Sequence, residues 1–225
     1  MEAIKNLKLE KIVKLTLISI IGSILITISA KTKIPFYPVP MTMQTFAILL
    51  IGITLGYKIG LATVMLYLFE GIIGLPVFSN SPEKGIGIAY FIGPTMGYLI
   101  GFLVAVCFAG AFKYDKGILN TFLKLIFSVS FIYILGVIWL GTLIGWEKPI
   151  FKLGVQPFLL AELFKILLLL FLIPTLLKVK KLIKVTEEIF WKESFAKFFY
   201  AFLVCALFQK HSCYIIQKLY EYVPT

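Results

Sequence analysis

The sequence predicts an all-α, polytopic membrane protein with six transmembrane helices and a C-terminal amphipathic or short apolar helix. Of its 225 residues, 60% are hydrophobic, and the mean hydropathy is +0.98, whereas soluble domains are usually about half apolar. The apolar residues occur in blocks, each near the length that crosses about 30 Å of hydrocarbon as a helix. Charged residues lie mainly between or beyond these blocks. The lipid bilayer is therefore the expected environment of the chain.

Six apolar blocks are separated by residues that stop or turn a helix. The loop KTKIPFYPVP after the first block contains three prolines, and each removes an amide donor and disfavours helix in the preceding residue. Gly56-Tyr57-Lys58 separates two short blocks, the connection Ile72–Ile92 carries Gly, Pro, Ser and Asn, and KYDKG precedes the fifth block. The predicted spans are approximately Ile12–Ala30, Thr42–Gly56, Ile59–Gly71, Gly93–Phe112, Leu119–Ile144 and Phe158–Leu177.

The basic residues predict how the spans are oriented. All 22 are lysines, against 11 acids, and the net charge is +11. With six crossings and a cytoplasmic N-terminus, eleven lysines flank the spans on the cytoplasmic side and five on the outer side. This is the bias expected of a multi-pass plasma (inner) membrane protein with both termini cytoplasmic. It also accounts for the positive charge without nucleic acid as a partner.

The chain is predicted to consist of one membrane domain and an extension. Residues 1–184 form the six-span, substrate-binding domain, and residues 185–225 form the C-terminal extension. Within the extension, Phe195–Phe208 is apolar apart from Lys197. This segment is short for a span and predicts a helix at the membrane interface, with a seventh span as the alternative.

No group of residues predicts catalysis or a bound metal or cofactor. Cys107, Cys205 and Cys213 form no paired or ligand spacing, and His211 is the only histidine. The sequence also lacks the motifs of serine hydrolases, Walker-type ATPases and zinc peptidases. The chain is therefore predicted not to be an enzyme, and an ATPase that drives it must be another chain.

Two opposite charges stand in the sixth predicted span. Glu162 and Lys165 are three residues apart, so they lie on one helix face and can neutralise each other. A charge in hydrocarbon costs several kcal/mol unless it is paired or solvated, which makes such a pair a candidate functional site. Both lie near the outer end of the span, where they predict a polar clamp for a ligand from outside. The alternative is an ion pair that only locks this helix to its neighbours.

The outer loop and the third and fourth spans contain further candidates. Asn80 offers donors and acceptors for a urea or amide ligand, although a loop asparagine is often a turn residue. Glu70, at the end of the third span, either lines the same pocket or is a solvated helix end. Gly93, Gly97 and Gly101 recur every four residues, so one face of the fourth span permits close approach of a helix or ligand.

The first span carries a stripe of small residues. Ser19, Ser23 and Thr27 lie four residues apart and therefore on one helix face. Small residues at this spacing predict close contact with another helix, either in this chain or in a partner subunit.

Five motifs in order resemble those of the BioY family, the biotin-binding subunits of energy-coupling factor transporters. The match covers roughly residues 10–180. The motifs are IPFYPVPMTMQTFAILLIG with PVP-x-T-x-QT at 38–45, GLPVF at 74–78, GPT-x-GYLIGF at 93–102, GV-x-WL at 136–140 and PF-x-x-x-x-L-x-K at 157–165.

The resemblance implies a role for each matched position. Lys165 matches a ligand-contacting lysine of the family, and Glu162 stands where the family usually has aspartate. Gln44 and Tyr98 match motif positions that face or support the pocket. Met96 replaces a common glycine, and the chain has no arginine, which some members use in the outer loop.

The resemblance also implies a mechanism and partners. Such subunits bind biotin from outside, associate with a membrane coupling subunit and ATP-binding subunits, and release biotin inside. The stripe Ser19, Ser23 and Thr27 resembles their docking surface for the coupling subunit. Two alternatives remain open: a subunit of the same architecture for another vitamin, and a stand-alone secondary transporter.

Overall fold

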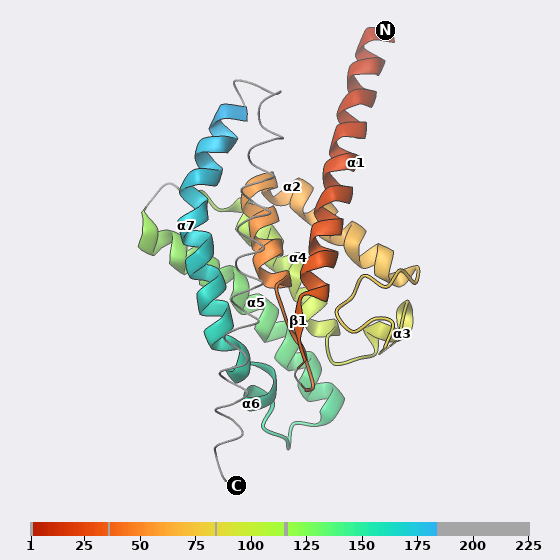
Figure 1. Ribbon diagram of the computed structural model, residues 1–225, viewed down its shortest axis with the longest axis vertical. Coiled ribbons are helices and arrows are strands. Elements are labelled where there is room, and N and C mark those ends of the chain that lie inside the picture. The colour runs from red at the N-terminus through yellow and green to blue at the C-terminus, as the bar shows by residue number, and fades with distance from the viewer. Residues whose placement is uncertain (1, 36, 84, 115–116, 184–225) are drawn as a thin grey trace.

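The computed structural model describes residues 2–35, 37–83, 85–114 and 117–183 (Figure 1). The predicted extension 185–225, including the segment Phe195–Phe208, lies outside the described residues. The elements in order are α1 (Glu2–Lys31), β1 (Lys33–Ile34), β2 (Met41–Thr42), α2 (Gln44–Ile72), α3 (Ile88–Phe91), α4 (Met96–Ala111), α5 (Ile118–Ile144), α6 (Ile150–Gly154), the 3-10 turn η1 (Gln156–Phe158) and α7 (Leu159–Ile183).

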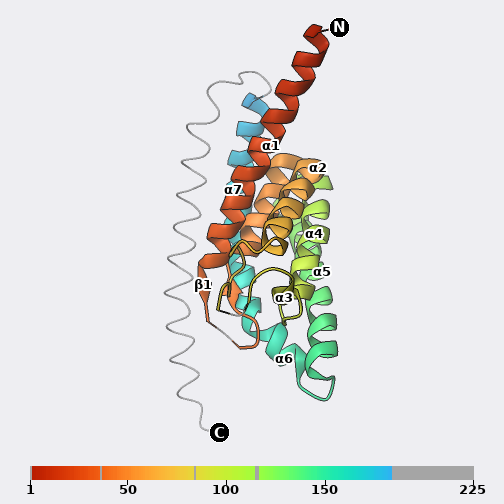
Figure 2. The same cartoon turned by 90° about the vertical axis from the view of Figure 1, so that its right-hand side faces the viewer.

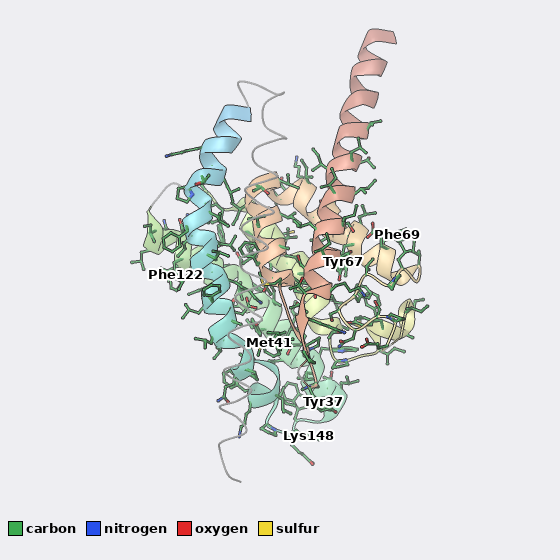
Figure 3. All side chains as sticks on the ribbon, viewed as in Figure 1. Tyr37, Met41, Tyr67, Phe69, Phe122 and Lys148 are labelled. Carbon is green, nitrogen blue, oxygen red and sulfur yellow. The ribbon has the colours of Figure 1, made fainter. Side chains whose placement is uncertain are left out.

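The long helices pack around α2, the helix with the most buried residues. α2 packs on α1, α4 and α7, and α4 packs on α5. One buried cluster contains Tyr67, Phe78 and Tyr98, and a second contains Phe46 and Leu125. Figure 2 shows the N-terminal end of α1 and the C-terminal end of α7 at one end of the molecule and β1, α3 and α6 toward the other. We therefore describe the fold as an all-α bundle with connecting segments gathered at one end.

The helix α2 changes direction at Gly56. This residue has φ 78° and ψ 171°, outside the helical region and at a positive φ that glycine adopts without strain. A side chain at Gly110 of α4 would overlap the backbone of Gly56 and Tyr57, so α4 packs closely against the bend. Figure 1 shows the two halves of α2 leaving the bend in different directions. The turn predicted at Gly56-Tyr57-Lys58 therefore lies within one long helical element.

The described residues contain enough apolar helix for a membrane protein. By length and composition, three segments among them can each cross a bilayer: Gln44–Ile72, Ile118–Ile144 and Ile150–Lys178. Thr16–Lys31 and Met96–Ala111 are shorter apolar helices. The structure is mostly helical and consistent with an all-α membrane protein, and the number of six crossings stays a prediction.

Two predicted span boundaries were wrong. The second span was predicted from Thr42, but Met41–Thr42 pairs antiparallel with Lys33–Ile34, and the helix begins only at Gln44. The fourth span was predicted from Gly93, but α4 begins at Met96. The carbonyl of Gly93 accepts hydrogen bonds from the amide of Met96 at 3.4 Å and from Trp139 Nε1 at 2.9 Å.

The glycine face predicted for the fourth span packs on α5. A side chain at Gly97 would overlap Leu135 and Trp139, and one at Gly101 would overlap Ile132. Gly93 lies before the helix and so is not part of this face. The close approach predicted from the glycine spacing therefore joins α4 to α5 within the chain.

Candidate ligand-binding site

A pocket lies between the loops before and after α2 and the helices α2, α4, α5 and α7. It contains about 550 Å³ of space not occupied by atoms, part of it open to solvent. Its wall is mostly aromatic and aliphatic. The lining residues are Val39, Pro40, Thr42, Gln44, Thr45, Phe78, Ser79, Tyr90, Thr95, Tyr98, Leu99, Phe102, Ile132, Tyr133, Phe158, Glu162 and Lys165.

Glu162 and Lys165 form a buried ion pair in this pocket. They are 6% and 3% exposed, and Lys165 Nζ lies 2.7 Å from Glu162 Oε1. The i, i+3 spacing on α7 brings the two groups together, as predicted from the sequence. Removing either partner would leave an uncompensated buried charge, which is strongly unfavourable.

Thr45 of α2 completes the polar cluster. Its hydroxyl donates to Glu162 Oε1 at 2.8 Å and accepts from Lys165 Nζ at 3.0 Å. Lys165 also donates to the carbonyl of Thr42 at 2.6 Å, just before α2 begins. These bonds connect residues more than a hundred positions apart in the chain. The cluster therefore fixes the start of α2 against α7.

Glu162 lines the pocket, and the cluster leaves one of its carboxylate oxygens without a hydrogen bond. An ammonium has three donors, and those of Lys165 meet Thr42, Thr45 and Glu162. Glu162 Oε2 is buried and accepts no hydrogen bond from the residues that the structure describes. Tyr133, another lining residue, lies beside the carboxylate and interacts with it through a side-chain hydrogen-bonding contact as well as electrostatically. A buried carboxylate oxygen in this state favours a ligand that supplies an N–H or O–H donor.

Gln44 and Tyr98 line the pocket, and their polar groups are bonded within the protein. Gln44 Nε2 donates to the Tyr67 hydroxyl at 2.9 Å, and its Oε1 accepts from the Thr42 hydroxyl at 3.1 Å. The Tyr98 hydroxyl donates to the carbonyl of Gly154 at 2.9 Å. The geometry of both residues therefore favours support of the pocket wall over direct polar contact with a ligand.

Asn80 and Glu70 lie outside the pocket lining. Asn80 accepts a hydrogen bond from Lys33 Nζ at 3.0 Å, so it holds the loop between α2 and α3 to β1. Glu70 accepts a hydrogen bond from Ser23 of α1. The pocket therefore combines four of the five predicted ligand-binding residues, namely Lys165, Glu162, Gln44 and Tyr98, and leaves Asn80 beside it.

The small-residue stripe of α1 faces α2 of the same chain. Ser23 is fully buried, Ser19 is 9% exposed, and Thr27 is half-buried. Between them, Gly22 packs against Thr63 of α2. The exposed side of α1 is instead mainly apolar, and its large exposed side chains are Val13, Leu17, Ile20, Ile24 and Ile28. Docking of the stripe on a partner subunit stays a prediction.

The sequence did not predict Thr45, Tyr133, Ser79 or Tyr90 as residues of the pocket. The hydroxyls of Ser79 and Tyr90 lie 3.2 Å apart. The available signal for Thr45 was its place in the PVP-x-T-x-QT motif, directly after Gln44. Tyr133 and Tyr90 stand in apolar or mixed segments, where an aromatic residue gives no sign of which face it occupies. Their placement follows from helix packing.

Known proteins match this chain over most of its length. Residues 3–182 match the model of the BioY family. The chain is 35% identical over 141 residues to "Probable biotin transporter BioY" of Pyrococcus horikoshii, which covers 63% of this chain and 82% of that protein. It is 33% identical over 162 residues to "Biotin transporter BioY2" of Lactococcus lactis, covering 70% and 86% of the two chains.

A solved structure has a similar fold. It is the crystal structure of the S-component for biotin from an ECF-type ABC transporter, with a TM-score of 0.63 and 26% sequence identity. The likeness covers 75% of this chain and 93% of that chain. The family match spans every element that lines the pocket, from the loop before α2 to α7. On this evidence the chain belongs to the BioY family.

Proposed function

We propose that this protein binds biotin at the outer face of the plasma membrane and serves as the substrate-capture subunit of an uptake system. The observation that carries the proposal is Glu162 Oε2, a buried acceptor in a largely apolar pocket. The ureido ring of biotin supplies N–H donors, and the rest of the molecule is mainly apolar. The names of the relatives and of the matching structure support the same ligand.

Each part of the cluster has a distinct role in this proposal. Glu162 accepts a hydrogen bond from a ureido N–H, and such charge-assisted bonds are about twice as strong as neutral ones. Lys165 balances the carboxylate and, with Thr45, holds its other oxygen. The aromatic wall, including Phe78, Tyr90 and Phe158, packs on the apolar part of the ligand.

We propose further that the chain crosses the membrane six times, with α2 contributing two crossings on either side of Gly56. The break in α2 supports this count. An even number of crossings places both ends of residues 1–184 on one side, and Figures 1 and 2 show the start of α1 and the end of α7 at one end of the molecule. The lysine bias makes that side cytoplasmic.

Delivery of biotin to the cytoplasm is assigned to other chains. We propose a membrane coupling subunit and ATP-binding subunits as partners, in keeping with the ECF-type transporter named for the matching structure. Reconstitution in proteoliposomes tests this assignment. ATP-dependent biotin uptake is expected only when the coupling and ATP-binding subunits are present, and ATP-independent uptake by this chain alone would favour a secondary transporter.

Calorimetric titration of the purified protein tests the ligand. Biotin should bind with nanomolar affinity, and thiamine and riboflavin should not bind. A biotin analogue methylated on both ureido nitrogens is the matched control, because it keeps the apolar body and removes the N–H donors. Equal affinity for biotin and this analogue would contradict the role of Glu162 Oε2, and preference for another vitamin would contradict the ligand.

A further inference from the structure

We propose that Lys31, the last residue of α1, is a positioning residue for the wall of the pocket. Its ammonium holds the turn Phe78–Ser81, and from this turn Phe78 and Ser79 reach the pocket. The identity of the ligand that this wall retains rests on the proposed function. The link between Lys31 and the wall does not.

The contacts of Lys31 converge on the backbone of the turn. Its Nζ donates to the carbonyls of Phe78 at 2.9 Å and Ser81 at 2.7 Å, and it lies 3.5 Å from the Ser81 hydroxyl. The amide and hydroxyl of Ser81 also donate to the carbonyl of Phe78, at 3.2 Å and 3.0 Å. Bonds from an ammonium to neutral oxygens are charge-assisted and stronger than ordinary ones. Lys31 therefore ties the end of α1 to a segment about fifty residues further along the chain.

The side chains of the same turn are seated in the protein interior. The ring of Phe78 is 1% exposed, stacks on Tyr90 with ring centroids 4.6 Å apart, and meets the edge of Tyr67. It rests against Gly71, where any side chain would overlap it. The Ser79 hydroxyl lies 3.2 Å from that of Tyr90. The bonds from Lys31 to the backbone and the packing of the side chains thus both hold this part of the wall in place.

The loop has little other support from regular structure. Residues 73–83 and 85–87 contain no helix or strand, so their backbone positions depend on individual contacts. Loss of the Lys31 bonds removes the charged donor that two backbone carbonyls share. We therefore expect the turn to open more often, which exposes Ser79 and speeds escape of a bound ligand.

Lys33 provides a matched control on the same loop. Its Nζ donates to Asn80 Oδ1 at 3.0 Å and lies 3.4 Å from Glu83, whose side chain is 76% exposed. Neither of these partners lines the pocket. Exposed ion pairs contribute little to stability. Removing Lys33 takes away one side-chain bond to Asn80 and this exposed ion pair, but no backbone bond of the turn, so it should disturb the wall less than removing Lys31.

Thiol labelling of the ligand-free protein tests the link between Lys31 and the wall, and it does not depend on any ligand. Ser79 is 4% exposed, so in a background with the native cysteines replaced by alanine the thiol of S79C should react slowly with a soluble maleimide. Adding Lys31→Met should raise the labelling rate about fivefold or more, the scale of one lost hydrogen bond. Lys33→Met should raise it less than Lys31→Met does, because it removes no backbone bond of the turn, and Lys31→Arg, which keeps the charge and the donors, should restore slow labelling. Equal rates with Lys31→Met and Lys33→Met would overturn the proposal.

Biotin dissociation gives a second readout with native Ser79. The dissociation rate constant should rise about fivefold in Lys31→Met and return toward the parent value in Lys31→Arg. An unchanged rate constant in Lys31→Met would overturn the role of Lys31 in ligand retention. A parent protein that binds no biotin would instead contradict the proposed function, and the labelling rates would still decide whether Lys31 holds the wall.

Discussion

Two glutamates within apolar helices differ in their surroundings. Glu162 lines the pocket and is 6% exposed; one of its oxygens bonds Lys165 and Thr45, and the other is buried without a hydrogen bond from the described residues. Glu70 is half-buried at the end of α2 and accepts a hydrogen bond from Ser23 of α1. The first carboxylate lies in a cavity with a cation beside it, and the second joins two helices. Binding should therefore depend on Glu162 and its partners, and helix association on Glu70.

The largest effect is expected from Lys165→Ala. This change removes the cation beside Glu162 and leaves a buried carboxylate unpaired, so biotin binding should weaken by at least about 2 kcal/mol, or roughly 30-fold. Calorimetric titration measures the loss. Lys152→Ala is the control, because Lys152 is exposed on α6 and outside the pocket. An affinity for biotin in Lys165→Ala equal to that of the parent would contradict the dependence of binding on the partners of Glu162.

The next effect is expected from two changes at Glu162. Glu162→Gln keeps the size of the side chain and removes its charge, so biotin affinity should fall about tenfold or more, the scale of a charge-assisted hydrogen bond. Glu162→Asp keeps the charge and restores the acid usual in the family with a side chain one methylene shorter, so its effect should be smaller. The dissociation constants of the two variants for biotin show whether the charge or the length of this side chain matters more. A larger loss for aspartate than for glutamine would show that reach matters more than charge.

The ion pair was predictable from the sequence, whereas the pocket around it was not. Glu162 and Lys165 are three residues apart, and helix geometry alone brings such residues together. Thr45 reaches the pair from 117 positions away through the packing of α2 on α7, which no local pattern encodes. The motif PVP-x-T-x-QT identified the segment that contains Thr45 but not the residues that Thr45 contacts. Local spacing therefore predicts pairs on one helix, and tertiary packing decides what surrounds them.

The same distinction explains the outcome for the small residues. The spacing of Ser19, Ser23 and Thr27 correctly predicts a close helix contact, and the contact that the structure contains is with α2. A stripe of small residues indicates that another helix packs closely, but it does not indicate whether that helix belongs to the same chain or to a partner. The short pairing of β1 with β2 likewise has no signal in the sequence, because the two strands have two residues each and flank a loop that contains three prolines.

A moderate effect is expected from Thr45→Val. The change keeps the shape of the side chain and removes the hydroxyl that bridges Glu162 and Lys165, so biotin affinity should fall by about 1 kcal/mol, or roughly fivefold. Thr45→Ser keeps the hydroxyl and should stay within about twofold of the parent. Titration of both variants separates the bridge from packing. An equal loss in the serine and valine variants would assign the effect to the methyl group.

The smallest effect is expected at the contact between Ser23 and Glu70. Side-chain hydrogen bonds between membrane helices contribute about 0.6 kcal/mol on average, so Ser23→Ala and Glu70→Gln should each lower the thermal stability only slightly. Both should leave biotin affinity within about twofold of the parent, because neither residue lines the pocket. In a double-mutant cycle, the two changes should be non-additive in stability and additive in binding. A loss of affinity in Glu70→Gln as large as that in Glu162→Gln would show that both carboxylates serve the ligand, and the division between a binding glutamate and a packing glutamate would fail.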